Sequence, residues 1–192
     1  MFEHELMAGK NVHLTEIDPE TDAMVEAAWT QDPVYRLLME YDKPRGWTAD
    51  ELKKYYEAHL KDSDEHRNEF HFGVRANTDN RLVGIFTIPG VEWSNRSMKF
   101  HIGFGHVNDL QNWGTEAFRL GLNYIFGELN IYLAAMHVPQ FCREMVEVVE
   151  EEGMQLTARR REAVFYNGRY WAELVFCIQH PIWMARRTGV AE

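Results

Sequence analysis

The spacing of apolar and polar residues divides the chain into a helical first third and a mixed remainder. Apolar residues alternate with polar ones over residues 10–17, which predicts an opening strand. Three helices are expected next, over residues 21–30, 33–39 and 48–60. Asp32 supplies a capping oxygen ahead of Pro33 at the start of the second helix. Thr48 and Glu51 form a capping box at the start of the third.

The rest of the chain mixes strands with helices. Three β-rich segments with short links predict an antiparallel meander over residues 70–74, 82–88 and 98–104. In the last segment one face is apolar, and the other carries Lys99, His101 and Gly103. Further along, the pattern predicts a helix over 114–128, a strand over 131–138, a helix over 141–152 and a hairpin of strands 163–166 and 169–178 around Asn167-Gly168.

This order, β-α-α-α-β-β-β-α-β-α-β-β, runs without a repeat, a low-complexity tract or a Gly/Pro/Ser linker. A chain of 192 residues has the length of one ordinary domain. We therefore expect a single domain over residues 1–192, with loose ends at residues 1–8 and 186–192.

Composition and charge restrict the partners. The chain is 45% hydrophobic, which predicts a globular fold, and 30 acidic against 20 basic residues give a net charge of −10. That sign disfavours nucleic acid and anionic membranes and suits a cationic small molecule or basic peptide, although it also serves solubility alone. Two cysteines, no basic and apolar leader and no apolar run of ~20 residues indicate a cytoplasmic protein.

Familiar site motifs are mostly absent. Gly103-Phe104-Gly105 lacks the third glycine of a dinucleotide fingerprint, and the nine histidines show no metal-ligand spacing, so no metal is expected. What remains is the predicted loop between residues 104 and 114. A helix entered through Asn112, Trp113, Gly114 and Thr115 would present free backbone amides to an anion such as phosphate.

An ordered set of short motifs resembles the GNAT superfamily of acyl-CoA N-acyltransferases. It is most similar to the branch of the ribosomal-protein N-terminal and spermidine acetyltransferases. The motifs are Gly114-Thr115-Glu116-Ala117, Asn123-Tyr124-Ile125-Phe126, Glu128-Leu129-Asn130, Glu151-Glu152-Gly153-Met154 and Tyr166-Asn167-Gly168-Arg169-Tyr170. The resemblance implies an α+β fold with a mostly antiparallel sheet of about seven strands, splayed in the middle and flanked by about four to five helices.

The resemblance also implies direct transfer of an acetyl group from acetyl-CoA to a primary amine of a small molecule or peptide. Members bind the pyrophosphate of the acyl-CoA with a loop of the form Arg/Gln-x-x-Gly-x-Gly/Ala. Here that register reads Asp109 to Gly114, with Asp109 and Asn112 as departures, while Gln111 with Gly114 keeps the spacing in another register. The residues expected to bind acetyl-CoA are Phe104, Gln111, Asn112, Trp113, Gly114, Thr115 and Cys142.

Three other family positions are also changed. Cys142 stands for a usual Asn, Val149 for a usual general-acid Tyr, and Lys99 for a frequent Glu. Because the amine must lose a proton, His101 and His137 become the candidate bases, although a surface or hydrogen-bonded core histidine is the more common explanation for each. These departures leave two hypotheses, an N-acetyltransferase and a GNAT-fold binding module that has lost transfer. Relatives also suggest a homodimer through the C-terminal strands.

Overall fold

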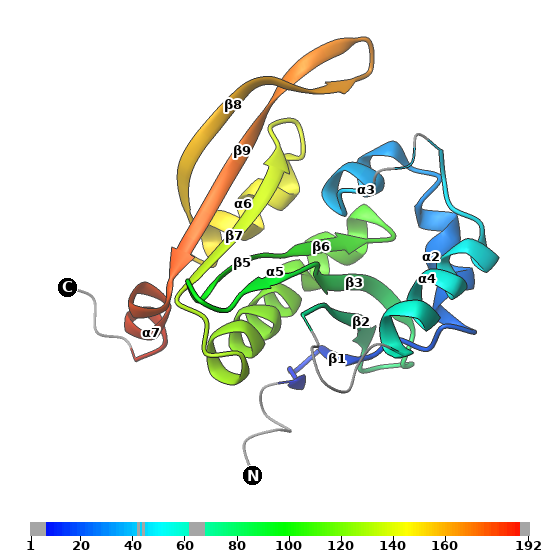
Figure 1. Ribbon diagram of the computed structural model, residues 1–192, viewed down its shortest axis with the longest axis horizontal. Coiled ribbons are helices and arrows are strands. Elements are labelled where there is room, and N and C mark those ends of the chain that lie inside the picture. Colours follow the sequence, from blue (N-terminus) through cyan, green and yellow to red (C-terminus); the bar gives the residue numbers. More distant parts are fainter. Residues whose placement is uncertain (1–6, 42, 44, 62–67, 189–192) are drawn as a thin grey trace.

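The computed structural model describes residues 7–41, 43, 45–61 and 68–188 (Figure 1). It begins with strand β1 (Val12–Glu16) and continues through helices α2 (Asp22–Trp29), α3 (Pro33–Leu38) and α4 (Ala49–Lys61). The predicted opening strand and three helices are therefore confirmed. The Asp32 side chain accepts a hydrogen bond from the Val34 amide at 2.8 Å, and the Thr48 amide donates to Glu51 at 2.9 Å.

Two sheets form the centre of the molecule. One is antiparallel with the order β1-β2-β3-β6, adding β2 (Phe70–Ala76), β3 (Leu82–Ile88) and β6 (His101–Phe104). The other has the order β4-β5-β7-β9-β8 and consists of β4 (Val91–Glu92), β5 (Ser97–Lys99), β7 (Leu133–Pro139), β8 (Gln155–Tyr166) and β9 (Arg169–Gln179). The pair β5–β7 is parallel, and the other pairs in the described residues are antiparallel. The predicted α+β fold with a splayed, mostly antiparallel sheet is confirmed.

The strand expected over residues 98–104 is interrupted at Phe100. Its first part, β5, belongs to the second sheet, and its last part, β6, pairs with β3 of the first. The Phe100 amide donates to the Ala135 carbonyl of β7 at 3.0 Å, and its ring is fully buried. This change of partner at Phe100 opens the sheet between β6 and β7.

Helix α5 (Val107–Asn123) starts seven residues before the predicted helix over 114–128, so the prediction of a loop before residue 114 is wrong. The helix begins at Val107, and residues 124–128 form a π-helical turn at its other end. The buried positions Leu110, Gly114 and Ala117 lie along one face, so the helical period extends further toward the N-terminus than the glycine motif indicated. Helix α6 (Arg143–Glu151) then packs against α5.

At the end of the chain, the structure differs from the sequence prediction in two places. Strand β8 begins at Gln155 rather than 163, because pairing with β9 orders a polar segment that shows no apolar alternation. The expected loose tail over 186–192 is helical as far as 188 in α7 (His180–Thr188), where Trp183 is buried beside Phe126. Residues 1–6 and 189–192 lie outside the described residues. The β8–β9 hairpin projects beyond the rest of the molecule in Figure 1.

The helices α2 to α4 cover a small aromatic core that contains a buried carboxylate. Glu26 has no exposed surface and accepts hydrogen bonds from the hydroxyls of Tyr35, Tyr41 and Tyr56. Burial raises the pKa of Glu26 above its usual value, while the three hydroxyls oppose the shift. This network ties α2 to α3, to the segment after it and to α4, and so fixes α3, which packs against β6.

Candidate active site

The opening between β6 and β7 starts directly after Phe100. Lys99 of β5 is in register with Ala135 of β7, and beyond this pair the facing edges of β6 and β7 pair with no other strand in the described part of the chain. Because side chains alternate along a strand, Lys99 and His101 point away from the fully buried Phe100 and Ile102. The side chains on that face therefore border the place where the sheet opens.

His101 is the first residue of β6 and is almost completely buried, with 3% of its surface exposed. Burial lowers the pKa of its imidazole to about 4, and the neighbouring Glu40 and a hydrogen bond to the backbone of Leu38 oppose that fall. Its Nδ1 has no hydrogen-bond partner among the described residues. The imidazole is therefore neutral at pH 7, with a free lone pair on Nδ1.

His137 lies across the opening, on β7, and contacts two carboxylates. Its Nδ1 is 3.3 Å from Oε1 of Glu40 and 3.4 Å from Oε2 of Glu173. Glu40 also forms an ion pair with Lys99, and Glu173 forms one with Arg160 at 2.6 Å. The carboxylates of Glu40 and Glu173 therefore hold the imidazole of His137 at the opening of the sheet.

A cavity of about 270 Å³ lies beside this cluster, where α3, the end of β6 and the first turns of α5 and α6 meet. Leu38 connects the two, since it lines the cavity and its backbone bonds His101. The lining combines aromatic rings, two sulfur atoms and two carboxylates: Asp32, Val34, Tyr35, Leu38, Phe104, Gly105, His106, Val107, Leu110, Phe141, Cys142, Glu144, Met145 and Tyr166. Aromatic faces with carboxylates suit a cationic ligand.

Two tyrosines line the cavity, and their hydroxyls differ in availability. The Tyr35 hydroxyl donates to buried Glu26 at 2.9 Å, and burial beside that carboxylate raises the pKa of Tyr35 well above its usual value. The Tyr166 ring stacks on Phe141 at 4.5 Å between centroids, and among the described residues its hydroxyl has no hydrogen-bond partner. Tyr166 is thus the cavity tyrosine whose hydroxyl is available to a ligand.

Cys142 is the N-cap residue of α6 and lines the same cavity. Burial raises the pKa of its thiol to about 12, and the nearby carboxylates of Glu144 and Asp32 add to the shift. The thiol therefore stays protonated at neutral pH, so Cys142 contributes shape rather than a thiolate nucleophile.

The expected phosphate loop is not a loop. Gln111, Asn112, Trp113, Gly114 and Thr115 all lie inside α5, where their amides belong to the helix and are not free for an anion. Thr115 donates its hydroxyl to Glu151 at 2.9 Å, and Gly114 packs against Leu110 and Val148.

The free amides of the helix lie instead at its actual start. His106 is the N-cap residue and makes no capping hydrogen bond with its side chain, and the first intrahelical bond comes from the Asp109 amide. The amides of Val107 and Asn108 precede that bond, and Val107 lines the cavity. An anionic ligand of this cavity would therefore meet the helix about two turns earlier than predicted.

Asp109, which departs from the family pattern, has a structural partner. Its carboxylate receives two hydrogen bonds from the Arg81 guanidinium, at 3.0 and 3.1 Å, and only 6% of the residue is exposed. It does not line the cavity. Arg81, which directly precedes β3, therefore supplies a counter-charge that offsets the repulsion expected between Asp109 and a phosphate.

Of the residues predicted from sequence, the structure brings His101 and His137 together at the opening, and Phe104 and Cys142 into the adjacent cavity. The five residues 111–115 lie away from it. Sequence reasoning missed Glu40, Glu173 and Tyr166. Only the last had a signal, since it belongs to the quoted hairpin motif; the two glutamates reach the site through a turn and a strand pairing that no local pattern shows.

No group of three or more metal-binding side chains in the described residues is arranged to hold a metal ion. Within the same residues, none of the helices combines the length and the apolar character needed to cross a bilayer.

A sheet that opens between two central strands, with a cavity and titratable side chains at the opening, defines an acyltransferase fold of the GNAT type. The family model described as acetyltransferase (GNAT) domain matches residues 11–155. The chain therefore belongs to this family, and the predictions of a GNAT fold and of an N-acetyltransferase-like protein that uses acetyl-CoA are confirmed.

Its relatives are polyamine acetyltransferases. The chain is 26% identical to the spermidine N(1)-acetyltransferase of Vibrio cholerae over 121 residues, 63% of this chain and 67% of that protein. It is 22% identical to the enzyme of the same name from Escherichia coli K12 over 170 residues, 88% of this chain and 82% of that one. The V. cholerae spermidine N-acetyltransferase in complex with CoA and spermine superposes with a TM-score of 0.77 at 22% identity, covering 92% and 99% of the two chains.

Proposed function

We propose that the chain transfers an acetyl group from acetyl-CoA to a primary amine of a polyamine-like cation. The observation that carries the proposal is the pair of histidines at the opening of the sheet, one with a free buried lone pair and one between two carboxylates. The carboxylates around the site, and the spermidine acetyltransferases among the relatives, support a cationic acceptor.

The residues fit an acyl-CoA in part. The amides at the start of α5 face the cavity, and the unpaired edges of β6 and β7 offer backbone groups to a pantetheine chain, but the usual phosphate loop is replaced by helix. Acetyl-CoA supplies an activated acetyl thioester when bound. Phe104, Val107 and Cys142 would contact it, in place of the five residues 111–115.

We assign different roles to His101 and His137. An acceptor ammonium has a pKa of ~10, so complete proton transfer to an imidazole of pKa about 4 would be uphill by roughly 8 kcal/mol. His101 is therefore a hydrogen-bond acceptor that orients the amine, rather than its base. His137, which contacts Glu40 and Glu173 at the same opening, is the residue that we assign as the base.

The step balances with the chain's own groups. The ammonium first gives up one proton, which His137 passes to solvent. The amine nitrogen then forms a bond to the acetyl carbonyl carbon, the carbon–sulfur bond breaks, the nitrogen releases its second proton to His137, and the leaving thiolate takes a proton from the Tyr166 hydroxyl. Solvent restores both side chains. Tyr166 thus takes the general-acid role that Val149 cannot fill.

The test is a steady-state assay of CoA release with acetyl-CoA and spermidine. His137→Gln should lower kcat about a hundredfold or more, and Tyr166→Phe about tenfold or more, with little change in the KM for acetyl-CoA. His13→Gln is the matched control, because His13 lies on β1 and bonds Asn77 far from the opening. Wild-type activity in the His137→Gln variant would contradict the assignment of the base.

The alternative is a GNAT-fold binding module without transfer, which the replacement of the phosphate loop by α5 favours. Calorimetry separates the two. Saturable binding of acetyl-CoA supports the transferase. Absence of binding at millimolar ligand, together with spermidine binding, supports the module. The expected homodimer and the cytoplasmic location stay predictions.

A further inference from the structure

The projecting β8–β9 hairpin carries a second pocket, apart from the opening of the sheet. Its volume is about 480 Å³, within the range of pockets that hold small ligands. The lining residues are Gln140, Arg159, Arg161, Glu162, Arg169, Tyr170, Trp171 and Ala172. Three arginines and one glutamate leave a formal surplus of two positive charges, in a chain whose net charge is −10.

The shape of the pocket follows from an irregular strand. Arg160 is in register with Glu173 and Val164 with Trp171, so three residues of β8, 161–163, lie opposite Ala172 alone. Glu162, in the middle of this bulge, has a φ of +52°. A bulge of this kind bends its strand away from its partner and redirects side chains, and it is a common device at binding sites.

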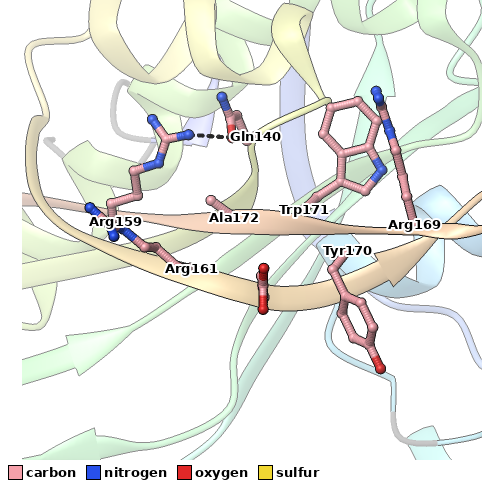
Figure 2. A pocket seen from close by; sticks show the side chains of 8 residues that line it. Gln140, Arg159, Arg161, Arg169, Tyr170, Trp171 and Ala172 are labelled. Atoms are coloured by element: carbon pink, nitrogen blue, oxygen red, sulfur yellow. Dashed lines mark hydrogen bonds between the residues drawn. The ribbon is translucent and has the colours of Figure 1, made fainter.

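The arginines of the pocket lack the partners that other cations of the chain have. Arg75, Arg81, Arg119 and Arg160 each bond a carboxylate. In the described residues, by contrast, the pocket arginines make no ion pair: Arg159, Arg161 and Arg169. Figure 2 shows Arg159 and Arg161 at one end of the pocket and Arg169 at the other, so these unneutralised guanidinium groups would stabilise a ligand with more than one negative charge.

Two of these guanidinium groups are held in place by uncharged neighbours, as Figure 2 shows. Arg159 donates to Oε1 of Gln140 at 2.7 Å, and Arg169 stacks 3.5 Å from the centre of the Trp171 ring. The Trp171 indole is itself fixed by a hydrogen bond to the Tyr166 carbonyl at 3.2 Å. Stacking occupies a face of the Arg169 guanidinium and leaves its N–H edge free, which lowers the entropy lost when an oxyanion binds.

We propose that this pocket binds the phosphate groups of an organic phosphate. Several fork-shaped donors around one hollow match the several oxygens and the multiple charge of a phosphate or diphosphate better than they match a single carboxylate. The same chemistry has two sources, the phosphates of the acyl-CoA nucleotide and a separate phosphorylated ligand. The proposal does not depend on acetyl transfer.

The test measures binding of sodium pyrophosphate and of adenosine 3′,5′-bisphosphate by calorimetry at low salt. Arg161→Gln and Arg169→Gln should each weaken binding about tenfold, because each removes a charge-assisted contact. Lys54→Gln, an exposed residue of α4 that removes the same charge, should change it less than about twofold. Equal melting temperatures and equal sedimentation of the variants and the wild type show that fold and assembly are kept.

Two results would overturn the proposal: wild-type protein that binds neither probe up to about 10 mM, or arginine variants that bind as tightly as wild type. If the variants lose the bisphosphate and acetyl-CoA in parallel, the site holds the phosphates of the nucleotide. If they lose pyrophosphate but keep acetyl-CoA, it holds a separate ligand. Pyrophosphate binding by a chain that binds no acetyl-CoA would support this pocket while contradicting the proposed function.

Discussion

At the residue scale, burial changes the chemistry of one side chain, His101, from what its residue type predicts. His101 was a candidate base because its ordinary pKa lies near 7. Its burial in β6 lowers that pKa to about 4, so the same residue becomes an acceptor that stays neutral. His137, which is equivalent in the sequence pattern, has two carboxylates beside it and is the base in the proposed reaction.

The lowered pKa of His101 predicts a dependence of stability on pH. Between pH 6.5 and about 4 the unfolded chain binds a proton that the folded chain does not, so the contribution of His101 is complete above pH 6.5 and is lost as the pH falls. The free energy of unfolding should fall by up to about 1.4 kcal/mol per pH unit more in wild type than in His101→Asn. Urea unfolding of both proteins at pH 7, 6 and 5 measures this slope, and parallel slopes would contradict it.

At the element scale, the start of α5 is the feature that differs most from expectation. The family motif placed a loop up to Gly114, whereas the helix begins at Val107 and buries Leu110 and Asp109. The buried Leu110 and Gly114 share one helical face, so the apolar spacing of the helix extends to residues before the glycine motif. The pairing of Asp109 with Arg81, 28 residues earlier, is what makes a buried acid tolerable there.

This ion pair gives the second prediction. Arg81→Gln leaves the Asp109 carboxylate buried without its counter-charge and should lower the free energy of unfolding by about 1–2 kcal/mol, a modest cost because Arg81 is 46% exposed. Arg81→Gln combined with Asp109→Asn should cost less than the sum of the single changes. Chemical denaturation of the full cycle measures the coupling. As a control, Arg45→Gln, which breaks an exposed pair with Glu51, should lower the free energy of unfolding less. If the effects of Arg81→Gln and Asp109→Asn simply add, the ion pair does not have the stabilising role described here.

At the scale of the whole molecule, the two sheets meet where the chain passes directly from β5 to β6. Phe100 is the residue between β5 and β6, fully buried, and its ring contacts Phe86 and Phe118. The opening that holds the candidate site exists because the chain changes sheets there. Site geometry and global stability therefore depend on the same residue.

Phe100→Ala should lower the free energy of unfolding by about 3–5 kcal/mol, because it leaves a cavity where the sheets meet. Phe165→Ala removes the same atoms from a side chain that is 60% exposed on the hairpin and should change stability by less than about 0.5 kcal/mol. Thermal and urea unfolding compare the two variants. Equal losses would mean that Phe100 does not join the sheets as described.

Local sequence patterns predicted most of the helices and strands and the family. Alternation and helical spacing located β1, the helices α2 to α4 and strands β2 and β3, because each pattern reports which face of an element is buried. Asn167-Gly168 located the turn of the final hairpin. The ordered motifs identified the GNAT fold. Local patterns did not predict how the site is assembled. Glu40, Glu173 and His137 meet through a turn, a strand pairing and the opening of the sheet, and the pairing of β8 with β9 brings Arg159 and Arg161 to the same pocket as Arg169. The chemistry of both sites therefore comes from contacts between distant segments that only the folded chain creates.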